Sequence, residues 1–144
     1  MYKINISSRT LHCLRPAGTS RGVYTTRKSY YVTLSDTNQP DVVGIGECAT
    51  LPDLSCDAMS DEEYEQKLRS FCDDFCRTGI IDIDAMRPYP SMLFGLETAK
   101  AQLDAKGSIN FFSSSKSSVE EVDAYQGKQH NKQVQKKSLK KLDQ

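Results

Sequence analysis

Cysteine and histidine are the first candidates for chemistry in this chain of 144 residues. Cys72 and Cys76 lie one helical turn apart and could form a metal site with His12, but no second close pair completes a tetrahedral set. Cys72 also falls on an apolar stripe, and a free cysteine behaves as a small hydrophobic residue. We therefore interpret both thiols as buried structural groups and expect no metal or other cofactor in this chain.

A glycine pair and a carboxylate are the next candidates. Gly44-Ile45-Gly46 follows apolar residues, as in a dinucleotide-binding turn. The third glycine of that fingerprint is missing, however, and Glu47 and Cys48 follow instead of a helix start. Glu47 could be a catalytic carboxylate, or a residue at a strand end that fixes a loop. We predict no catalytic residue here, because no serine, histidine and carboxylate form a recognisable group.

Lysines near the C-terminus could contact phosphate groups: Lys128, Lys132, Lys136, Lys137, Lys140 and Lys141. Tyr125 is their only aromatic neighbour and arginine is absent, so stacking on bases would be poor. We interpret these residues as a solvated tail and expect no nucleic-acid partner. The alternative is a non-catalytic interaction module whose basic tail binds acidic partners or RNA.

Charge and hydropathy divide the chain into two unlike parts. Residues 1–105 carry 11 Lys and Arg against 15 Asp and Glu, whereas residues 106–144 carry 8 Lys against 4 acidic residues. Apolar residues number 44 of 105 in the first part and 10 of 39 in the second. So few apolar residues cannot offset the entropy of ordering a chain. We predict a folded domain over 1–107 and a disordered, low-complexity Lys/Ser/Gln tail over 108–144.

Compartment and membrane signals favour a soluble cytoplasmic protein. No segment approaches the ~20 consecutive apolar residues of a membrane span. Met1–Ile6 lack the basic and apolar sections of a signal peptide. Five cysteines, an odd number in no dense framework, suit a reducing compartment.

Three strands are predicted in the first half of the chain. Apolar and polar residues alternate over Tyr2–Ser7, and Tyr30–Leu34 and Val42–Cys48 are rich in β-branched and aromatic residues. Residues 36–41 are turn formers. Because no room exists for crossover helices, the strands should form an antiparallel meander.

Helices are predicted after the strands, which makes the fold class α+β. Ser60 and Glu63 have the spacing of a capping box, and Gly79 is a suitable stop. The first helix carries one apolar stripe: Tyr64, Leu68, Phe71, Cys72 and Phe75. The second begins at Ser91, ends at Gly107 and buries Met92, Leu96, Ala99 and Leu103. Gly95 inside it is either tolerated or a site of close packing.

Two segments carry a resemblance to a known family. Gly44–Ser55 resembles the GEC-x-x-LP-x-LS loop of the o-succinylbenzoate synthases of the enolase superfamily, and Pro90–Ala99 resembles their PS-x-x-FGLE-x-A helix start. The resemblance covers about residues 1–112 and is closest to synthases of the Bacteroides kind. It implies an α+β, enolase N-terminal-like capping domain packed on a (β/α)7β barrel. In that family the barrel holds Mg²⁺ on three carboxylates and carries two acid–base lysines.

The function implied by the resemblance is the dehydration (lyase) step that forms o-succinylbenzoate in menaquinone biosynthesis. The cap supplies two loops that close over the barrel and exclude water. In this sequence they correspond to a first mobile loop and a second loop, namely Pro16, Ala17, Gly18, Thr19, Ser20, Arg21 and Gly22, and Ala49, Thr50, Leu51, Pro52, Asp53 and Leu54.

The barrel residues of the family have no counterpart in this chain, since it has no Lys-x-Lys strand and no spaced acidic ligands. We therefore expect a truncated or frameshifted synthase, with a change of frame near Phe112, that is inactive alone. The expected partners are a barrel supplied in trans and a second copy binding through the exposed cap surface. A second alternative, besides the interaction module, is half of a split enolase-superfamily enzyme such as an epimerase.

Overall fold

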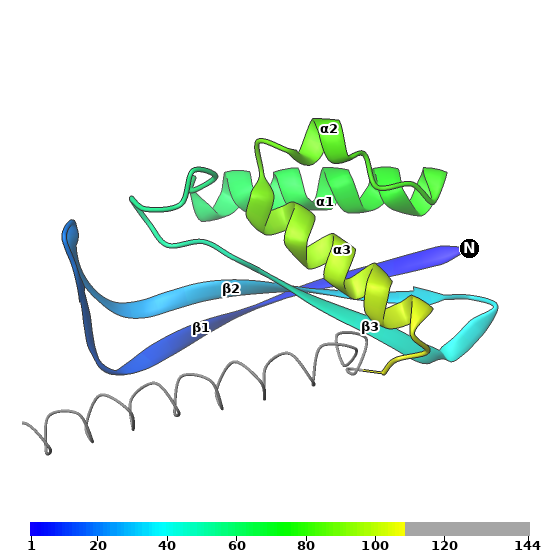
Figure 1. Ribbon diagram of the computed structural model, residues 1–144, viewed down its shortest axis with the longest axis horizontal. Coiled ribbons are helices and arrows are strands. Elements are labelled where there is room, and N and C mark those ends of the chain that lie inside the picture. Colours follow the sequence, from blue (N-terminus) through cyan, green and yellow to red (C-terminus); the bar gives the residue numbers. More distant parts are fainter. Residues whose placement is uncertain (109–144) are drawn as a thin grey trace, which may run out of the picture. The chain divides into compact units, whose positions relative to one another are not determined.

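The computed structural model describes residues 1–108, which fold into one sheet with helices on one of its faces (Figure 1). The sheet contains β1 (Tyr2–Thr19), β2 (Gly22–Asp36) and β3 (Gln39–Ala49), paired antiparallel in chain order. The helices α1 (Asp61–Thr78), α2 (Ile83–Met86) and α3 (Pro90–Asp104) follow. The predicted α+β meander is therefore confirmed, whereas the predicted tail lies outside the described residues.

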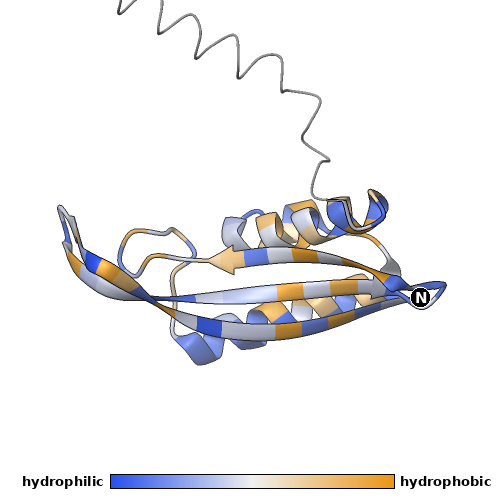
Figure 2. Ribbon diagram, turned by 90° about the horizontal axis from the view of Figure 1, so that it is seen from below, coloured by the Kyte–Doolittle hydropathy of each residue, from blue (hydrophilic) through white to orange (hydrophobic). Residues whose placement is uncertain are grey.

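Strand alternation builds the core from one face of the sheet. Tyr30, Val32 and Leu34 of β2 point toward the helices and are buried, while the residues between them are partly exposed. Hydrophobic and hydrophilic residues alternate along the strands (Figure 2), as a sheet covered on one side requires. Strand β3 adds Cys48 to the core, and the helices contribute its other members: Tyr64, Leu68, Cys72, Phe75, Met86, Met92, Leu96, Ala99 and Leu103.

Helix α1 begins and ends as predicted. Ser60 is the N-cap, its side chain accepts a hydrogen bond from the amide of Glu63, and the Glu63 carboxylate accepts from the Ser60 amide. Gly79 ends the helix in the left-handed conformation at φ 71°. These caps pair backbone groups that the helix leaves free, so a local motif sets both ends of α1.

The helices after α1 differ from the prediction. Helix α3 starts at Pro90, where the missing proline amide costs nothing, and stops at Asp104 rather than at Gly107. Its predicted buried face is confirmed. The single turn α2 was not predicted, because four residues are too few to show a helical period.

Three glycines let α3 lie directly against β3. A Cβ at Gly46 would stand 1.7 Å from the carbonyl oxygen of Gly95, and one at Gly44 would stand 1.9 Å from that of Ala99. A Cβ at Gly95 would stand 2.1 Å from the sulfur of Cys48. Of the two interpretations of Gly95, close packing is therefore confirmed. Gly44 and Gly46 thus form the surface of β3 on which α3 packs.

The first hairpin is much longer than predicted. Strands β1 and β2 extend beyond the helices as a two-stranded ribbon, at the end of the sheet opposite the N-terminus (Figure 1). Ser7–Gly22 is exposed throughout, and Leu14 is fully exposed. Residues 1–35 contain six Lys and Arg and no Asp or Glu, whereas residues 36–108 contain six against fifteen. The ribbon is therefore basic, and the rest of the described chain is acidic.

Candidate functional site

The hairpin tip holds the first predicted lid segment, Pro16–Gly22. The expectation of a loop is wrong for most of it, because Ala17, Gly18 and Thr19 pair with β2 and only Ser20 and Arg21 turn. The Thr19 hydroxyl accepts from the Arg21 amide at 3.3 Å and donates to the Gly22 carbonyl at 3.1 Å. A bulge at residues 13–16, opposite one residue of β2, precedes this tip. The segment is thus a tight turn on a bulged ribbon.

The second predicted lid segment, Ala49–Leu54, lies in the loop between β3 and α1. Ala49 ends β3, and the amides of Leu54 and Ser55 donate to the Leu51 carbonyl at 3.2 and 3.0 Å. The Ser55 hydroxyl accepts from the Leu51 amide at 2.9 Å. Asp53 has a φ of 63°, which a short polar residue tolerates better than most. The loop is therefore a compact turn held by its own hydrogen bonds.

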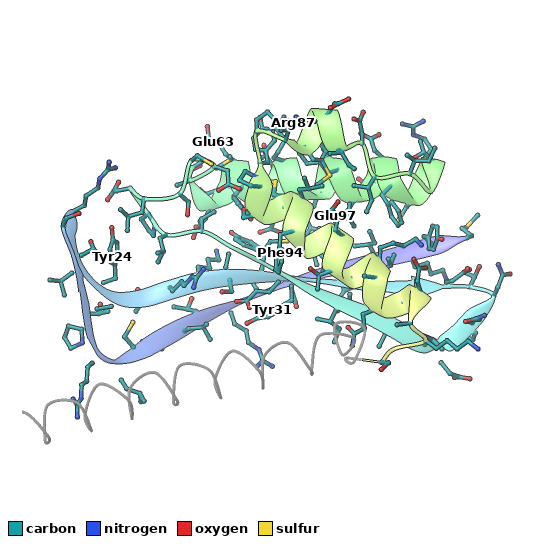
Figure 3. All side chains as sticks on the ribbon, viewed as in Figure 1. Tyr24, Tyr31, Glu63, Arg87, Phe94 and Glu97 are labelled. Atoms are coloured by element: carbon teal, nitrogen blue, oxygen red, sulfur yellow. The ribbon has the colours of Figure 1, made fainter. Side chains whose placement is uncertain are left out.

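The two predicted segments meet in space. The Tyr24 hydroxyl, two residues past the hairpin tip, donates to the Pro52 carbonyl at 2.8 Å, and an Arg21 guanidinium nitrogen donates to the Asp53 carbonyl. Tyr24 lies between the ribbon and the loop in Figure 3. Residues about thirty positions apart in sequence thus form one surface, which is the candidate site.

A buried carboxylate anchors the base of this loop, and sequence reasoning missed it. Asp57 accepts from the Ser91 amide at 2.8 Å and from the Ser91 hydroxyl at 2.5 Å. The Ser91 oxygen also lies 2.6 Å from the Tyr64 hydroxyl, whose pKa is raised by burial. Asp57 thereby pairs a free amide in the first turn of α3. The available sequence signal was Ser91, which lies within the Pro90–Ala99 motif.

A small cavity of about 80 Å³ lies beneath the loop. Thr50 and Pro52 form one side, and Tyr30 and Tyr64 form another. At its edge the Lys28 ammonium lies 2.9 Å from the Asp61 carboxylate, a hydrogen bond that raises the pKa of Lys28. The cavity has room for little more than water, so it is no substrate site by itself.

The remaining candidates for chemistry do not join this site. Glu47 is exposed on the sheet face away from the helices and makes no side-chain hydrogen bond within residues 1–108. Cys72 is buried, Cys76 is partly buried and His12 is exposed on the ribbon. Over residues 1–108, no three His, Cys, Asp or Glu side chains gather where they could hold a metal ion. His130 and the lysine cluster lie outside the described residues.

Cysteine reactivity gives a direct check on this arrangement. Burial raises the pKa of the Cys48 and Cys72 thiols to about 12, so both stay protonated and weakly nucleophilic at pH 8. Cys13 and Cys56 are exposed. We expect iodoacetamide to modify the two exposed thiols first and the two buried ones only after unfolding, as followed by peptide mass spectrometry. Equal labelling of Cys48 and Cys13 in the folded protein would contradict the packing.

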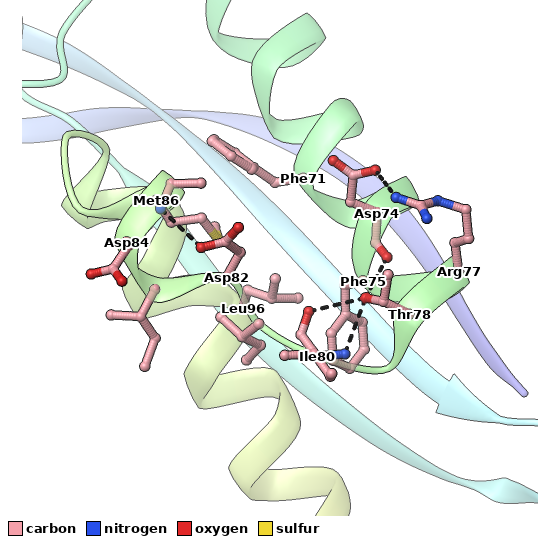
Figure 4. Close-up of a pocket in the computed structure, with 13 residues that line it drawn as sticks. Phe71, Asp74, Phe75, Arg77, Thr78, Ile80, Asp82, Asp84, Met86 and Leu96 are labelled. Atoms are coloured by element: carbon pink, nitrogen blue, oxygen red, sulfur yellow. Dashed lines mark hydrogen bonds and ion pairs between the residues drawn. The ribbon is translucent and has the colours of Figure 1, made fainter.

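A larger groove lies elsewhere, between the C-terminal half of α1 and residues 80–86 (Figure 4). It measures about 490 Å³ and has an apolar floor that includes Phe75, Met86 and Leu96. Ile80 and Ile83 are exposed in its wall, and the ion pair of Asp74 with Arg77, at 2.9 Å, lies at its rim. It contains no predicted site residue.

No helix within residues 1–108 is long and apolar enough to cross a membrane.

Comparison with known proteins gives likeness in structure only. No family model matches the chain, and no curated protein matches it. An o-succinylbenzoate synthase from Thermosynechococcus elongatus BP-1, solved with magnesium in its active site, is 23% identical over 75% of this chain and 30% of its own, with a TM-score of 0.49. A mandelate racemase/muconate lactonizing protein from Herpetosiphon aurantiacus is 16% identical over 70% of this chain and 29% of its own, with a TM-score of 0.52.

The chain spans about three-tenths of the length of these solved proteins. The second likeness shows that about 70% of this chain shares a fold with part of that protein. A three-stranded antiparallel sheet followed by helices is the arrangement of the enolase N-terminal capping domain, so the expected fold is confirmed.

Proposed function

We propose that residues 1–108 are the capping domain of an enolase-superfamily enzyme, and that the hairpin tip and the loop after β3 cover its active site. One observation carries the proposal. The two segments that the resemblance assigns to the lid are distant in sequence, yet Tyr24 and Arg21 join them by hydrogen bonds to consecutive carbonyls. A cover made of two segments needs such contact in order to exclude water from a reaction site.

The lid residues supply shape rather than charge chemistry in this proposal. Leu54 is an exposed apolar residue of the loop, and the apolar residues Ala49, Leu51 and Pro52 precede it in sequence. Together they would line the roof of a pocket, while acid–base groups come from the barrel. Residues 1–108 contain no cluster that fits Mg²⁺, so the metal of the family would be held by the barrel.

The reaction we propose for the complete enzyme is the Mg²⁺-dependent dehydration that forms o-succinylbenzoate in menaquinone biosynthesis. The Gly44–Ser55 and Pro90–Ala99 motifs support it. Asp57, two residues past the first motif, accepts hydrogen bonds from Ser91 of the second motif, and this contact ties the loop to the start of α3. The partner is a barrel domain, and the complex is proposed to be cytoplasmic.

Domain exchange tests this function. Residues 1–108 replace the cap of an o-succinylbenzoate synthase, and Mg²⁺-dependent product formation is followed by absorbance. We expect activity from the exchanged protein and none from residues 1–144 alone or from the barrel alone. Leu54→Asp, which places a charge in the proposed roof, should lower the activity. Asp41→Asn, at an exposed position near the start of β3, should not.

The result that would contradict the proposal is a folded, monodisperse exchanged protein with no activity. Circular dichroism and size-exclusion chromatography establish folding before the assay. Activity on racemase or epimerase substrates instead would keep the capping role and replace the proposed reaction.

A further inference from the structure

The basic ribbon has few contacts that hold its outer half in place. No helix covers Ser7–Gly22, and the residues of that stretch are exposed. Nearer the body of the domain, Lys28 pairs with Asp61 at 2.9 Å. Beyond that point, the side-chain bonds that join the ribbon to the rest of residues 1–108 are those of Arg21 and Tyr24. An uncovered two-stranded ribbon is only marginally stable, so these two bonds determine where its tip lies.

Both bonds end on backbone carbonyls of neighbouring residues, Pro52 and Asp53. The direction of these carbonyls is set inside the loop, by the left-handed conformation at Asp53 and by the bonds of Leu51, Leu54 and Ser55 with one another. The acceptors therefore depend on an ordered loop, and the donors depend on an ordered hairpin tip. Order in one segment stabilises order in the other.

We infer that Arg21 and Tyr24 are positioning residues that lock the hairpin tip and the loop after β3 into one body. Each side chain donates one hydrogen bond to the loop and makes no other side-chain hydrogen bond within residues 1–108. The use of this body as a single cover rests on the proposed function, whereas the lock itself does not.

The contacts at the base of the loop also favour its behaviour as one body with the hairpin tip. Asp57 fixes the base of the loop to Ser91 with two hydrogen bonds, and Ser91 contacts Tyr64 of α1. The loop is thus anchored at its base to the helices and at its middle to the ribbon. A displacement of the hairpin tip must therefore alter the conformation of the loop between these two anchors.

Hydrogen exchange of the full chain tests the lock at amides remote from the substitution. The amides of Leu51, Leu54 and Ser55 bond only within the loop, so their exchange reports loop order. We expect Tyr24→Phe and Arg21→Ala each to accelerate this exchange about fivefold, the equivalent of one net hydrogen bond. Arg21→Lys keeps a cationic donor and should retain the protection. The loss of one net hydrogen bond in Tyr24→Phe or Arg21→Ala should also lower the melting temperature by about 4–8 °C.

The matched controls are Tyr31→Phe and Arg15→Ala, whose polar groups make no hydrogen bond within residues 1–108. They should leave the three loop amides unchanged. Unaltered exchange in Tyr24→Phe and Arg21→Ala would overturn the lock, as would equal acceleration in the controls. Accelerated hydrogen exchange in both variants supports the lock even if the domain-exchanged synthase is inactive. That inactivity would reject the proposed function alone, so the two outcomes are distinguishable.

Discussion

Gly46→Ala is expected to destabilise the domain strongly. The new Cβ would stand 1.7 Å from the Gly95 carbonyl oxygen and 2.6 Å from its carbon, both of them backbone atoms of α3. A backbone cannot rotate away as a side chain does, so helix and strand must separate. Overpacking costs about 1–3 kcal/mol and occasionally more, and we expect a loss of about 3 kcal/mol or above. Urea unfolding followed by circular dichroism measures it.

Two further variants show whether the clash is the cause. Gly18→Ala is the matched control, because a Cβ there meets nothing within 4 Å, and its effect should stay within about 0.5 kcal/mol. Gly95→Ala places a Cβ 2.1 Å from the Cys48 sulfur. Because Cys48→Ala removes that sulfur, Gly95→Ala should cost less stability in the Cys48→Ala background than in the parent protein. A Gly46→Ala protein as stable as the parent would contradict the close crossing of α3 over β3.

Asp57→Ala is expected to cost about 2–4 kcal/mol of unfolding free energy. The substitution removes a buried acceptor and leaves the Ser91 amide and hydroxyl without it. Hydrogen bonds to a charged group contribute about 1.5–3 kcal/mol, and orphaned buried donors add a desolvation penalty. The loop after β3 should also lose order, because Asp57 is its anchor. Thermal melting and exchange of the Leu51 amide measure the two effects separately.

The control for Asp57 is Asp41→Ala, since Asp41 is exposed and forms no ion pair within residues 1–108. Its effect on stability should be close to zero. Ser91→Ala should lie between the two, because the Ser91 amide keeps its bond to Asp57 while the Tyr64 hydroxyl loses a partner. If Asp57→Ala melted with the parent, the buried carboxylate would have no anchoring role.

Elements with a local signal were predictable from the sequence. The capping box at Ser60, the stripe from Tyr64 to Phe75 and the glycine stop at Gly79 each follow from neighbours along the chain. The alternation at Tyr2–Ser7 marked one end of β1 for the same reason, because that end lies over the helices and is half-buried. An element that is buried on one side only therefore shows a periodic pattern of apolar residues in the sequence.

Features without such a pattern were not predictable. The outer half of the ribbon is exposed to solvent on both faces. Its sequence therefore shows no alternation of apolar and polar residues that would reveal the strands and the tight turn at Pro16–Gly22. The Asp57–Ser91 contact joins residues 34 positions apart, and no local spacing encodes it. The meeting of Tyr24 with Pro52 has the same origin. The candidate site was located by resemblance, and its internal bonds required the three-dimensional structure.

The separation of charge between ribbon and helices gives the domain an electric dipole. Residues 1–35 hold six cationic side chains and no carboxylate, and residues 36–108 hold an excess of nine carboxylates. The field of such an arrangement reaches about 8–10 Å at physiological ionic strength, beyond the range of contact. An acidic surface approaching this domain is therefore turned toward the ribbon before any atoms touch, and added salt slows that encounter.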